Sequence, residues 1–263
     1  MTIFGFDRRD VGMLFNMFKL TLTDRFLGSG LGLAWAVLSP LMLMMIFTFV
    51  FTFVFPNRLP GREGALPFVI WLLSGYAPWL AFSEGIMTST TSVVSNGGLV
   101  KNVAFKSEIL PISGAAVGIV PFLVGLTLIF VLQITLGEFP NTALLIIPLV
   151  LAIQILFISG LGLFLSALNV FLRDTALIMP NILLMLLFAS PIFYPITSYP
   201  EAIQAILQFN PFYVIAACYR APIIDGTLPP LWMLVYLVVI SIALFALGLW
   251  WFRRLKAFFS TRL

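Results

Sequence analysis

Long apolar segments separated by short polar ones dominate the hydropathy pattern of this 263-residue chain. A run of about 20 apolar residues crosses a bilayer as a helix. The apolar runs are continuous and do not alternate with a period of two, so they predict helices rather than strands. We therefore predict six membrane-spanning helices, at residues 31–55, 66–87, 109–136, 142–171, 176–194 and 229–252.

Two further apolar segments are predicted not to cross the membrane. Within residues 7–30, apolar residues recur on one helix face, which predicts an amphipathic helix lying in the membrane interface. These residues are Val11, Leu14, Phe15, Phe18, Leu22 and Phe26. Residues 196–228 start a helix at Pro200-Glu201 and break at Asn210-Pro211 into two pieces that are each too short to span. We predict a re-entrant hairpin of two short helices there, packed on protein or lining a cavity.

The composition supports a membrane protein. The chain is 61% hydrophobic and only 9% charged, its mean hydropathy is +1.12, and a soluble domain of this size is about one quarter charged. We predict an all-α integral membrane protein whose 263 residues form a single transmembrane domain. Cys218 is the only cysteine, which excludes an intrachain disulfide and a cysteine-cluster metal site.

The positions of lysine and arginine predict the orientation of the chain. If the N-terminus is inside, eleven of the fourteen Lys and Arg residues fall in cytoplasmic segments, and three (Arg58, Arg62 and Arg220) fall outside. We predict that both termini are cytoplasmic. The segment 98–111 and the turn between residues 171 and 176 are then cytoplasmic too.

Catalytic chemistry is sparse in this sequence. There is no histidine and no Gly-Lys pair, so neither the commonest acid–base group nor a phosphate-binding P-loop is present. No G-x-S-x-G nucleophile motif occurs. Glu84 is the only candidate for an ionisable group in mid-membrane, and it lies near the inner end of the second predicted span, where snorkelling to the interface accounts for it. We predict no catalytic residue and no metal site, and energy that comes from a partner at a cytoplasmic surface.

Two cytoplasmic segments are candidates for that partner contact. The stretch GLVKNVAFKSEILP at residues 98–111 combines apolar anchors with charges that set register, namely Leu99, Val103 and Phe105 with Lys101, Lys106 and Glu108. The second is the bend at Arg173-Asp174. On composition alone the simpler interpretation is that both are ordinary solvated turns following the positive-inside rule.

Several blocks, taken in order, carry a family resemblance: FLGSGLGLAWAVLSPLMLMMIFTFVF (26–51), LLSGYAPWLAFSEGI (72–86), LGLFLSALNVFLRD (161–174), SPIFYP (190–195), NPF (210–212) and YRAPI (219–223). Together with the segment 98–111, they closely resemble the transmembrane subunit of ABC-2 type polysaccharide exporters, which move O-antigen, capsular or teichoic-acid chains. The resemblance extends over essentially the whole chain.

The resemblance implies a homodimer in the bacterial cytoplasmic (inner) membrane, working with two copies of a separate ATPase. ATP and magnesium then belong to that ATPase, and this chain binds no cofactor. The segment 98–111 is implied to be the main coupling helix. The Arg173-Asp174 turn is implied to be a second, smaller contact, and an intrachain pairing that fixes the bend is an equal alternative.

The resemblance also makes the hairpin an outer gate, with Glu201, Asn210, Pro211 and Arg220 as its candidate residues. For Arg220 we expect an ion pair with Glu201 or Asp225; a contact with a phosphate or an acidic sugar is the alternative.

A polysaccharide needs a passage along which it can slide, and aromatic rings stack on sugar rings. The candidates for such a wall are Trp35, Tyr76, Trp79, Phe188, Phe193 and Tyr194. We expect fewer than half of them to line it, because phenylalanine also faces lipid and Trp and Tyr form interface belts. Two other functions stay open: an ABC-2 permease for a small molecule or lipid, and a membrane enzyme acting on a lipid-linked glycan.

Overall fold

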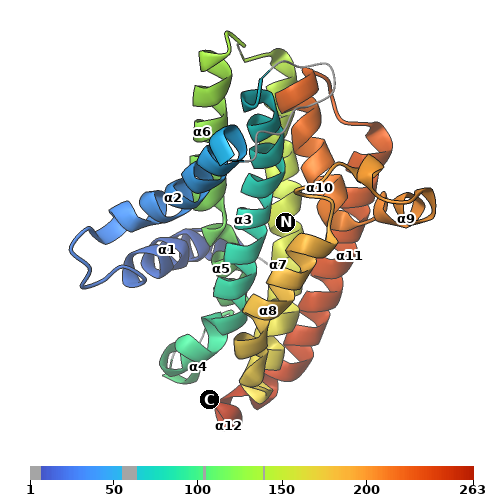
Figure 1. Ribbon diagram of the computed structural model, residues 1–263. Coiled ribbons are helices and arrows are strands. Elements are labelled where there is room, and N and C mark those ends of the chain that lie inside the picture. The colour runs from blue at the N-terminus through green and yellow to red at the C-terminus, as the bar shows by residue number, and fades with distance from the viewer. Residues whose placement is uncertain (1–6, 55–63, 103–104, 139) are drawn as a thin grey trace.

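A computed structural model describes residues 7–54, 64–102, 105–138 and 140–263 of the chain. In these ranges all the regular secondary structure is helical (Figure 1). The α-helices are α1 (Arg8–Asp24), α2 (Trp35–Phe49), α3 (Leu66–Ser95), α4 (Gly97–Asn102), α5 (Ile109–Val117), α6 (Ile119–Thr135), α7 (Ile147–Phe171), α8 (Asp174–Ala189), α9 (Glu201–Leu207), α10 (Pro211–Arg220), α11 (Leu231–Leu255) and α12 (Phe259–Arg262). The short helical turns are η1 (Gly32–Ala34), η2 (Val50–Val54), η3 (Thr142–Ile146), η4 (Ile196–Ser198), η5 (Ala221–Asp225) and η6 (Lys256–Phe258).

Five helical stretches are long and apolar enough to cross a membrane. They are Gly32–Val54, Leu66–Ser95, Ile109–Thr135, Thr142–Phe171 and Leu231–Phe258, which agree in position with five of the six predicted spans. A sixth candidate is the pair Glu201–Leu207 and Pro211–Asp225, which is bent by 83°. The chain is thus an all-helical protein with five or six candidate membrane spans.

The predicted fifth span, residues 176–194, is wrong at its C-terminal end. The helix there, α8, has 16 residues and stops at Ala189, so it is about 24 Å long at 1.5 Å per residue. Ser190 has an extended backbone with ψ 145, because a residue before proline is driven out of the helical region and Pro191 has no N–H to donate. Residues 190–195 therefore form a loop.

The helix α3 is the centre of the bundle. It packs against α5, α6, α7, α8 and α10. In the apolar stretch of α3, 78% of the residues are buried, whereas in that of the first span only 6% are. Figure 1 shows α1 and α2 projecting away from the bundle, whereas α3 and α7 run through it. The core of the chain therefore lies around α3, and the first span presents its apolar side chains outward.

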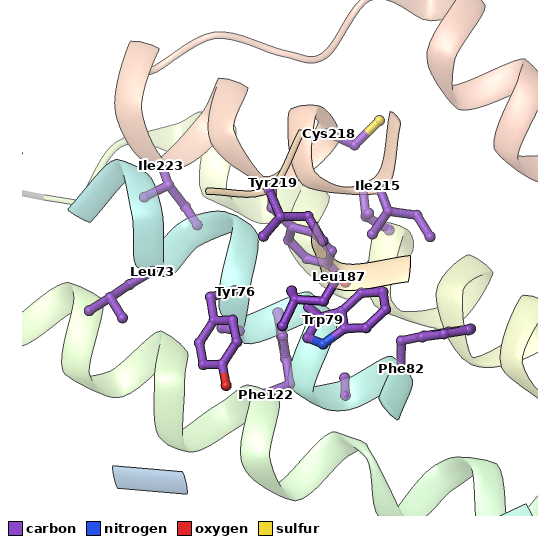
Figure 2. Packing of buried hydrophobic residues seen from close by; sticks show 14 of the residues in the cluster. Leu73, Tyr76, Trp79, Phe82, Phe122, Leu187, Ile215, Cys218, Tyr219 and Ile223 are labelled. Atoms are coloured by element: carbon purple, nitrogen blue, oxygen red, sulfur yellow. The ribbon is translucent and has the colours of Figure 1, made fainter. Parts of the chain in front are cut away.

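Aromatic and aliphatic side chains fill the space around α3. Figure 2 shows Tyr76 and Trp79 of α3 beside Tyr219 of α10 and Phe122 of α6, with Phe82 farther along α3. The ring centroids of Phe122 and Tyr219 lie 5.0 Å apart. One polar contact crosses this apolar core: the side-chain amide of Gln154 donates to the Pro78 carbonyl (2.7 Å) and accepts from the Tyr219 hydroxyl (2.8 Å). These hydrogen bonds satisfy polar groups that would otherwise be buried without partners.

The helices α7 and α11 approach each other at glycine. A Cβ at Gly160 would lie only 2.6 Å from the backbone of Leu244 and Phe245. Small residues at a helix crossing allow this kind of backbone approach in membrane proteins. The position therefore fixes α11 against α7 and so places the C-terminal end of the chain.

Two predicted segments differ from the structure in their bounds. The N-terminal helix ends at Asp24, short of the predicted 7–30. Residues 98–111 do not form one helix: α4 ends at Asn102, residues 105–108 form a turn, and α5 begins at Ile109. The physical reason is Pro111, because proline is tolerated in the first turn of a helix but lacks the N–H that a continuous helix needs there.

Candidate coupling site and outer hairpin

The short helix α4 and the C-terminal helix α12 lie at the same end of the bundle, which we call the α4 end (Figure 1). Of the predicted coupling residues, Lys101 is exposed, while Leu99 and Phe105 are half-buried. Val103 lies outside the described residues. The α4 end therefore presents a basic residue beside two apolar side chains that are partly accessible.

Lys106 pairs with the N-terminal helix. Its Nζ donates to Oδ2 of Asp10 at 2.6 Å and lies 3.8 Å from Oδ2 of Asp7. The hydrogen bond with Asp10 raises the pKa of Lys106, and the same bond lowers the pKa of Asp10. A residue predicted to set register on a partner is thus held within its own chain.

Glu108 is also paired within the chain, and it is only 1% exposed. Its Oε1 accepts hydrogen bonds from Lys256 Nζ (2.8 Å) and Arg253 Nε (3.2 Å). Burial pushes the pKa of Glu108 up, but hydrogen bonds from Lys256, the backbone and Arg253, together with the charge of Lys256, outweigh it, so its pKa lies below the usual range. In this conformation its carboxylate is not accessible to another protein.

Sequence reasoning missed Asp10, Arg253 and Lys256 as the partners of these two residues. The sequence did indicate that these acidic and basic residues all lie on the side of the membrane predicted to be cytoplasmic. Nothing in the spacing along the chain indicates which charges meet.

The bend at Arg173-Asp174 is held by an amide instead of an ion pair. Both charged side chains are exposed, and among the described residues neither meets an opposite charge within salt-bridge distance. Asn169 fixes the bend: its Oδ1 accepts from the Ala176 N–H (3.2 Å) and its Nδ2 donates to the Thr90 carbonyl (3.1 Å). The intrachain ion pair is thus absent from the described chain, and a partner contact at this turn stays a prediction.

Glu84 on α3 forms an ion pair with Arg25, which follows α1, and it also accepts from the Thr88 hydroxyl at 3.2 Å. The sequence interpretation treated Glu84 as a lone snorkelling side chain. In the structure this carboxylate connects the segment after the N-terminal helix to α3.

At the predicted break, Asn210-Pro211, two helices meet that are bent by 83°, and a re-entrant course for them stays a prediction. The helix α9 begins at Glu201, which is exposed, and α10 begins at Pro211 with Asn210 as its N-cap. The Asn210 side chain accepts from the Phe212 N–H (2.9 Å) and donates to the Ser190 hydroxyl (3.2 Å). Asn210 therefore caps α10 and fastens it to the loop that follows α8.

Arg220 at the end of α10 is 8% exposed and does not pair with Glu201 or Asp225, so that prediction is wrong. Its guanidinium donates to three backbone carbonyls, those of Trp71 (3.3 Å), Pro191 (3.4 Å) and Ile192 (2.6 Å). Its Cζ lies 3.9 Å from the ring centroid of Trp71, a cation–π distance. Carbonyl dipoles and an aromatic face take the place of the expected carboxylate.

This arrangement of Arg220, which we call the Arg220 staple, joins α3, the loop after α8, and α10. A Cβ at Gly75 of α3 would lie 2.5 Å from Nη2 of Arg220, so a side chain there would displace the guanidinium. Beyond the staple, Gln133 donates to the Ile223 carbonyl (2.6 Å) and Asn141 to the Pro222 carbonyl (3.1 Å). The hairpin is therefore fixed to the bundle by side-chain hydrogen bonds to backbone carbonyls, given by Arg220 of the hairpin in one direction and by Gln133 and Asn141 of the bundle in the other.

The six predicted channel aromatics divide into two sets. Tyr76 and Trp79 are each 5% exposed in the core (Figure 2). Phe193 is half-buried against Tyr76, with 5.5 Å between their ring centroids. Trp35, Tyr194 and Phe188 are exposed at 37%, 52% and 56%. In a single chain, only the second set is accessible to a passing molecule.

An all-helical bundle with five or six candidate membrane spans defines a multi-pass membrane protein. Residues 14–224 match the ABC-2 type transporter family, and the chain belongs to that family.

Three relatives that are similar along most of their length come from bacteria. The chain is 28% identical over 235 residues to the O-antigen export system permease protein RfbA of Myxococcus xanthus, covering 89% of this chain and 88% of that protein. It is 27% identical over 256 residues to an RfbA of Klebsiella pneumoniae, covering 95% and 96%. It is 24% identical over 238 residues to the polysialic acid transport protein KpsM of Escherichia coli, covering 89% of each.

Proposed function

We propose that this chain is the permease subunit of an ATP-driven exporter that moves a polysaccharide, an O-antigen-like chain carried on a lipid, across the cytoplasmic membrane. The observation that carries the proposal is similarity to O-antigen export permeases along nearly the full length of both proteins. Fold similarity alone does not fix a function. Here the likeness covers the spans, the α4 end and the hairpin together.

The working assembly is a homodimer of this chain with two copies of a separate ATPase, which binds ATP and magnesium. The chain itself contributes no catalytic residue. The outward apolar faces of α2 and α8 support this assembly, since Met45 and Phe49 of α2 are exposed at 55% and 58%, and Leu177 and Met185 of α8 at 75% and 71%. These faces contact lipid or the second copy, and in the dimer the passage runs between the two subunits.

The α4 end faces the cytoplasm, and so do both termini. Six basic residues at or near this end support the orientation, following the positive-inside rule: Lys101, Arg173, Arg253, Arg254, Lys256 and Arg262. The helix α1 then lies along the inner membrane surface. Its exposed apolar residues Val11 and Phe15, at 66% and 63%, enter the lipid.

The ATPase docks on the α4 end through Leu99, Lys101 and Phe105, with Val103 and the exposed Arg173-Asp174 turn as further contacts. Its movement reaches α3 through α4 and reaches α5 through the turn at residues 105–108. A hydrogen bond from the Ser89 hydroxyl to the Pro111 carbonyl, 2.7 Å long, ties these two helices together close to the α4 end. The two helices that flank the docking site therefore respond together.

The polymer slides along exposed aromatic rings, among them Trp35, Phe188 and Tyr194, which stack on sugar faces. The re-entrant hairpin is the gate on the outer side: its exposed arm α9, which starts at Glu201, is the part that moves, and α10, held through Asn210 and Arg220, is its anchor. The buried Tyr76 and Trp79 shape the wall from behind without touching the polymer.

The test uses the double variant Lys101→Glu with Phe105→Ala. We expect it to insert in the membrane as the wild type does, to lose its ATPase in a pull-down from the membrane, and to leave the polysaccharide inside the cell. Lys19→Glu, a reversal of an exposed charge on α1, is the matched control and retains both activities. If the double variant keeps the ATPase and exports normally, α4 is not the docking site.

A further inference from the structure

The turn between α4 and α5 holds two charged residues that point in different directions along the structure. Lys106 reaches the N-terminal helix, where its Nζ lies 2.6 Å from Asp10. Glu108, two residues later, reaches the C-terminal end of α11 and the turn η6, through Arg253 and Lys256. One short turn is thus bound to segments near both ends of the chain. Lys106 and Asp10 are 96 residues apart in sequence, and Glu108 and Arg253 are 145 residues apart.

The contact at Glu108 is the more buried of the two. Its side chain is 2% exposed, whereas those of Arg253 and Lys256 are 40% and 41% exposed. A buried carboxylate is stable only while its cations stay in place, because an unpaired buried charge is strongly destabilising. Glu108 therefore makes any displacement of the turn away from α11 costly.

Apolar packing supports the same connection. The C-terminal residues pack on a buried cluster that contains Phe252 and Phe259, with Val100 of α4 and Leu263 at its edge. A Cβ at Gly97 would lie 3.6 Å from Leu263 Cβ, which is ordinary van der Waals contact. The two rings, Phe252 and Phe259, meet edge to face at 5.2 Å. The last residues of the chain thus belong to the α4 end.

We propose that Lys106 and Glu108 are positioning residues that bind the ATPase-facing turn to α1 and to the C-terminal segment 253–263, so that the three segments move as one unit. This inference rests on the proposed docking of an ATPase at α4. It departs from the sequence interpretation, in which Lys106 and Glu108 touch the partner. Energy delivered at α4 then reaches the first and last spans directly, as well as the two spans adjoining the turn.

The experiment measures three quantities on the purified permease–ATPase complex in proteoliposomes: ATPase binding, ATP hydrolysis and glycan exported per ATP. Wild type must bind and export first; if it does neither, the proposed function itself fails. The variants are Glu108→Gln, Lys256→Gln, and the two combined. Arg254→Gln is the matched control, since Arg254 also lies in the last turn of α11 but faces Trp250, 5.5 Å from its ring centroid.

We expect Glu108→Gln and Lys256→Gln to bind the ATPase as wild type does and to hydrolyse ATP, but to export at least about fivefold less glycan per ATP, the lower range of a measurable coupling. The combined variant should be no worse than Glu108→Gln alone, because both changes break one contact. Arg254→Gln should match wild type.

Two results would overturn the inference. If export per ATP is unchanged in both single variants, the contacts do not transmit movement. If the variants lose ATPase binding instead, these residues belong to the docking surface. Should Glu108→Gln fail to fold, Lys256→Gln decides the question, because it alters a half-exposed partner and leaves Arg253 on the carboxylate.

Discussion

The α4 end and the hairpin hold their charged residues in contrasting ways. At the α4 end, Lys106 and Glu108 meet charges of opposite sign, on Asp10 (15% exposed) and Lys256 (41% exposed). At the hairpin, the buried Arg220 is held by three backbone carbonyls and an aromatic ring, with no carboxylate within salt-bridge distance among the described residues. Contacts of the first kind respond to protonation, salt and competing charges, whereas backbone carbonyls do not titrate and carry no net charge. The comparison indicates that the ion pairs at the α4 end are adjustable, whereas the contacts of Arg220 keep α10 fixed.

The largest effect is expected at the fixed end. Arg220→Ala removes the donor of three carbonyls in a buried place and should lower the free energy of unfolding by about 3–5 kcal/mol, since each unsatisfied buried group costs about 1–3 kcal/mol. Thermal unfolding of the purified protein in detergent measures it. The exposed Arg173→Ala should stay within about 0.5 kcal/mol of wild type; equal effects of the two changes would remove the contrast.

A substitution at Gly75 on α3 tests the Arg220 contacts from the helix that faces α10. Gly75→Ala places a Cβ 2.5 Å from the Arg220 guanidinium and should destabilise by about 1–3 kcal/mol, the usual range for overpacking. In an Arg220→Ala background the added methyl meets no guanidinium, so its cost should fall to near zero. Additive effects in the double variant, measured by the same unfolding assay, would show that Gly75 does not act through Arg220.

At the adjustable end, Glu108→Ala should cost less. The two cations that lose their partner are about 40% exposed and water takes over their solvation, so we expect a loss of about 1–2 kcal/mol. Unfolding in detergent at low salt is the measurement. A loss as large as that of Arg220→Ala would mean that the α4 end is as rigid as the hairpin.

The smallest effect is the dependence on pH. The pKa of Glu108 is depressed in the folded chain, so its contribution is complete above the unfolded value of about 4.3 and is lost as pH falls through the lower folded value. The difference in melting temperature between wild type and Glu108→Gln should therefore shrink as the pH is taken from 7 to below 4. The difference between wild type and Arg220→Ala should not follow that course, because its acceptors are carbonyls.

Much of the fold was predictable from sequence because long apolar runs and proline positions act locally. The spans, the break at Asn210-Pro211 and the start of α9 at Glu201 depend on nearby residues alone. The loop after Ala189 was missed although Pro191 signalled it, since apolar character continued through Phe193 and Tyr194. The discontinuity in 98–111 was likewise encoded by Pro111.

The site was less predictable, because its contacts join distant residues. That Lys106 meets Asp10, that Glu108 meets Lys256 and that Arg220 donates to carbonyls all depend on how helices pack, and hydropathy does not determine those pairings. Buried amides show the same limit. Asn169 was part of a quoted block, yet its role in fixing the bend before α8 follows from its contacts with Thr90 and Ala176.

Hydrogen–deuterium exchange on the purified chain, with and without its ATPase, is the most direct test of the proposed contrast between the docking end and the anchored helix α10. The account predicts that the ATPase slows amide exchange at residues 97–102 and 105–107 and leaves residues 214–220 of α10 unchanged. An ATPase that binds without protecting the α4 end, or that alters exchange in α10 instead, would contradict it.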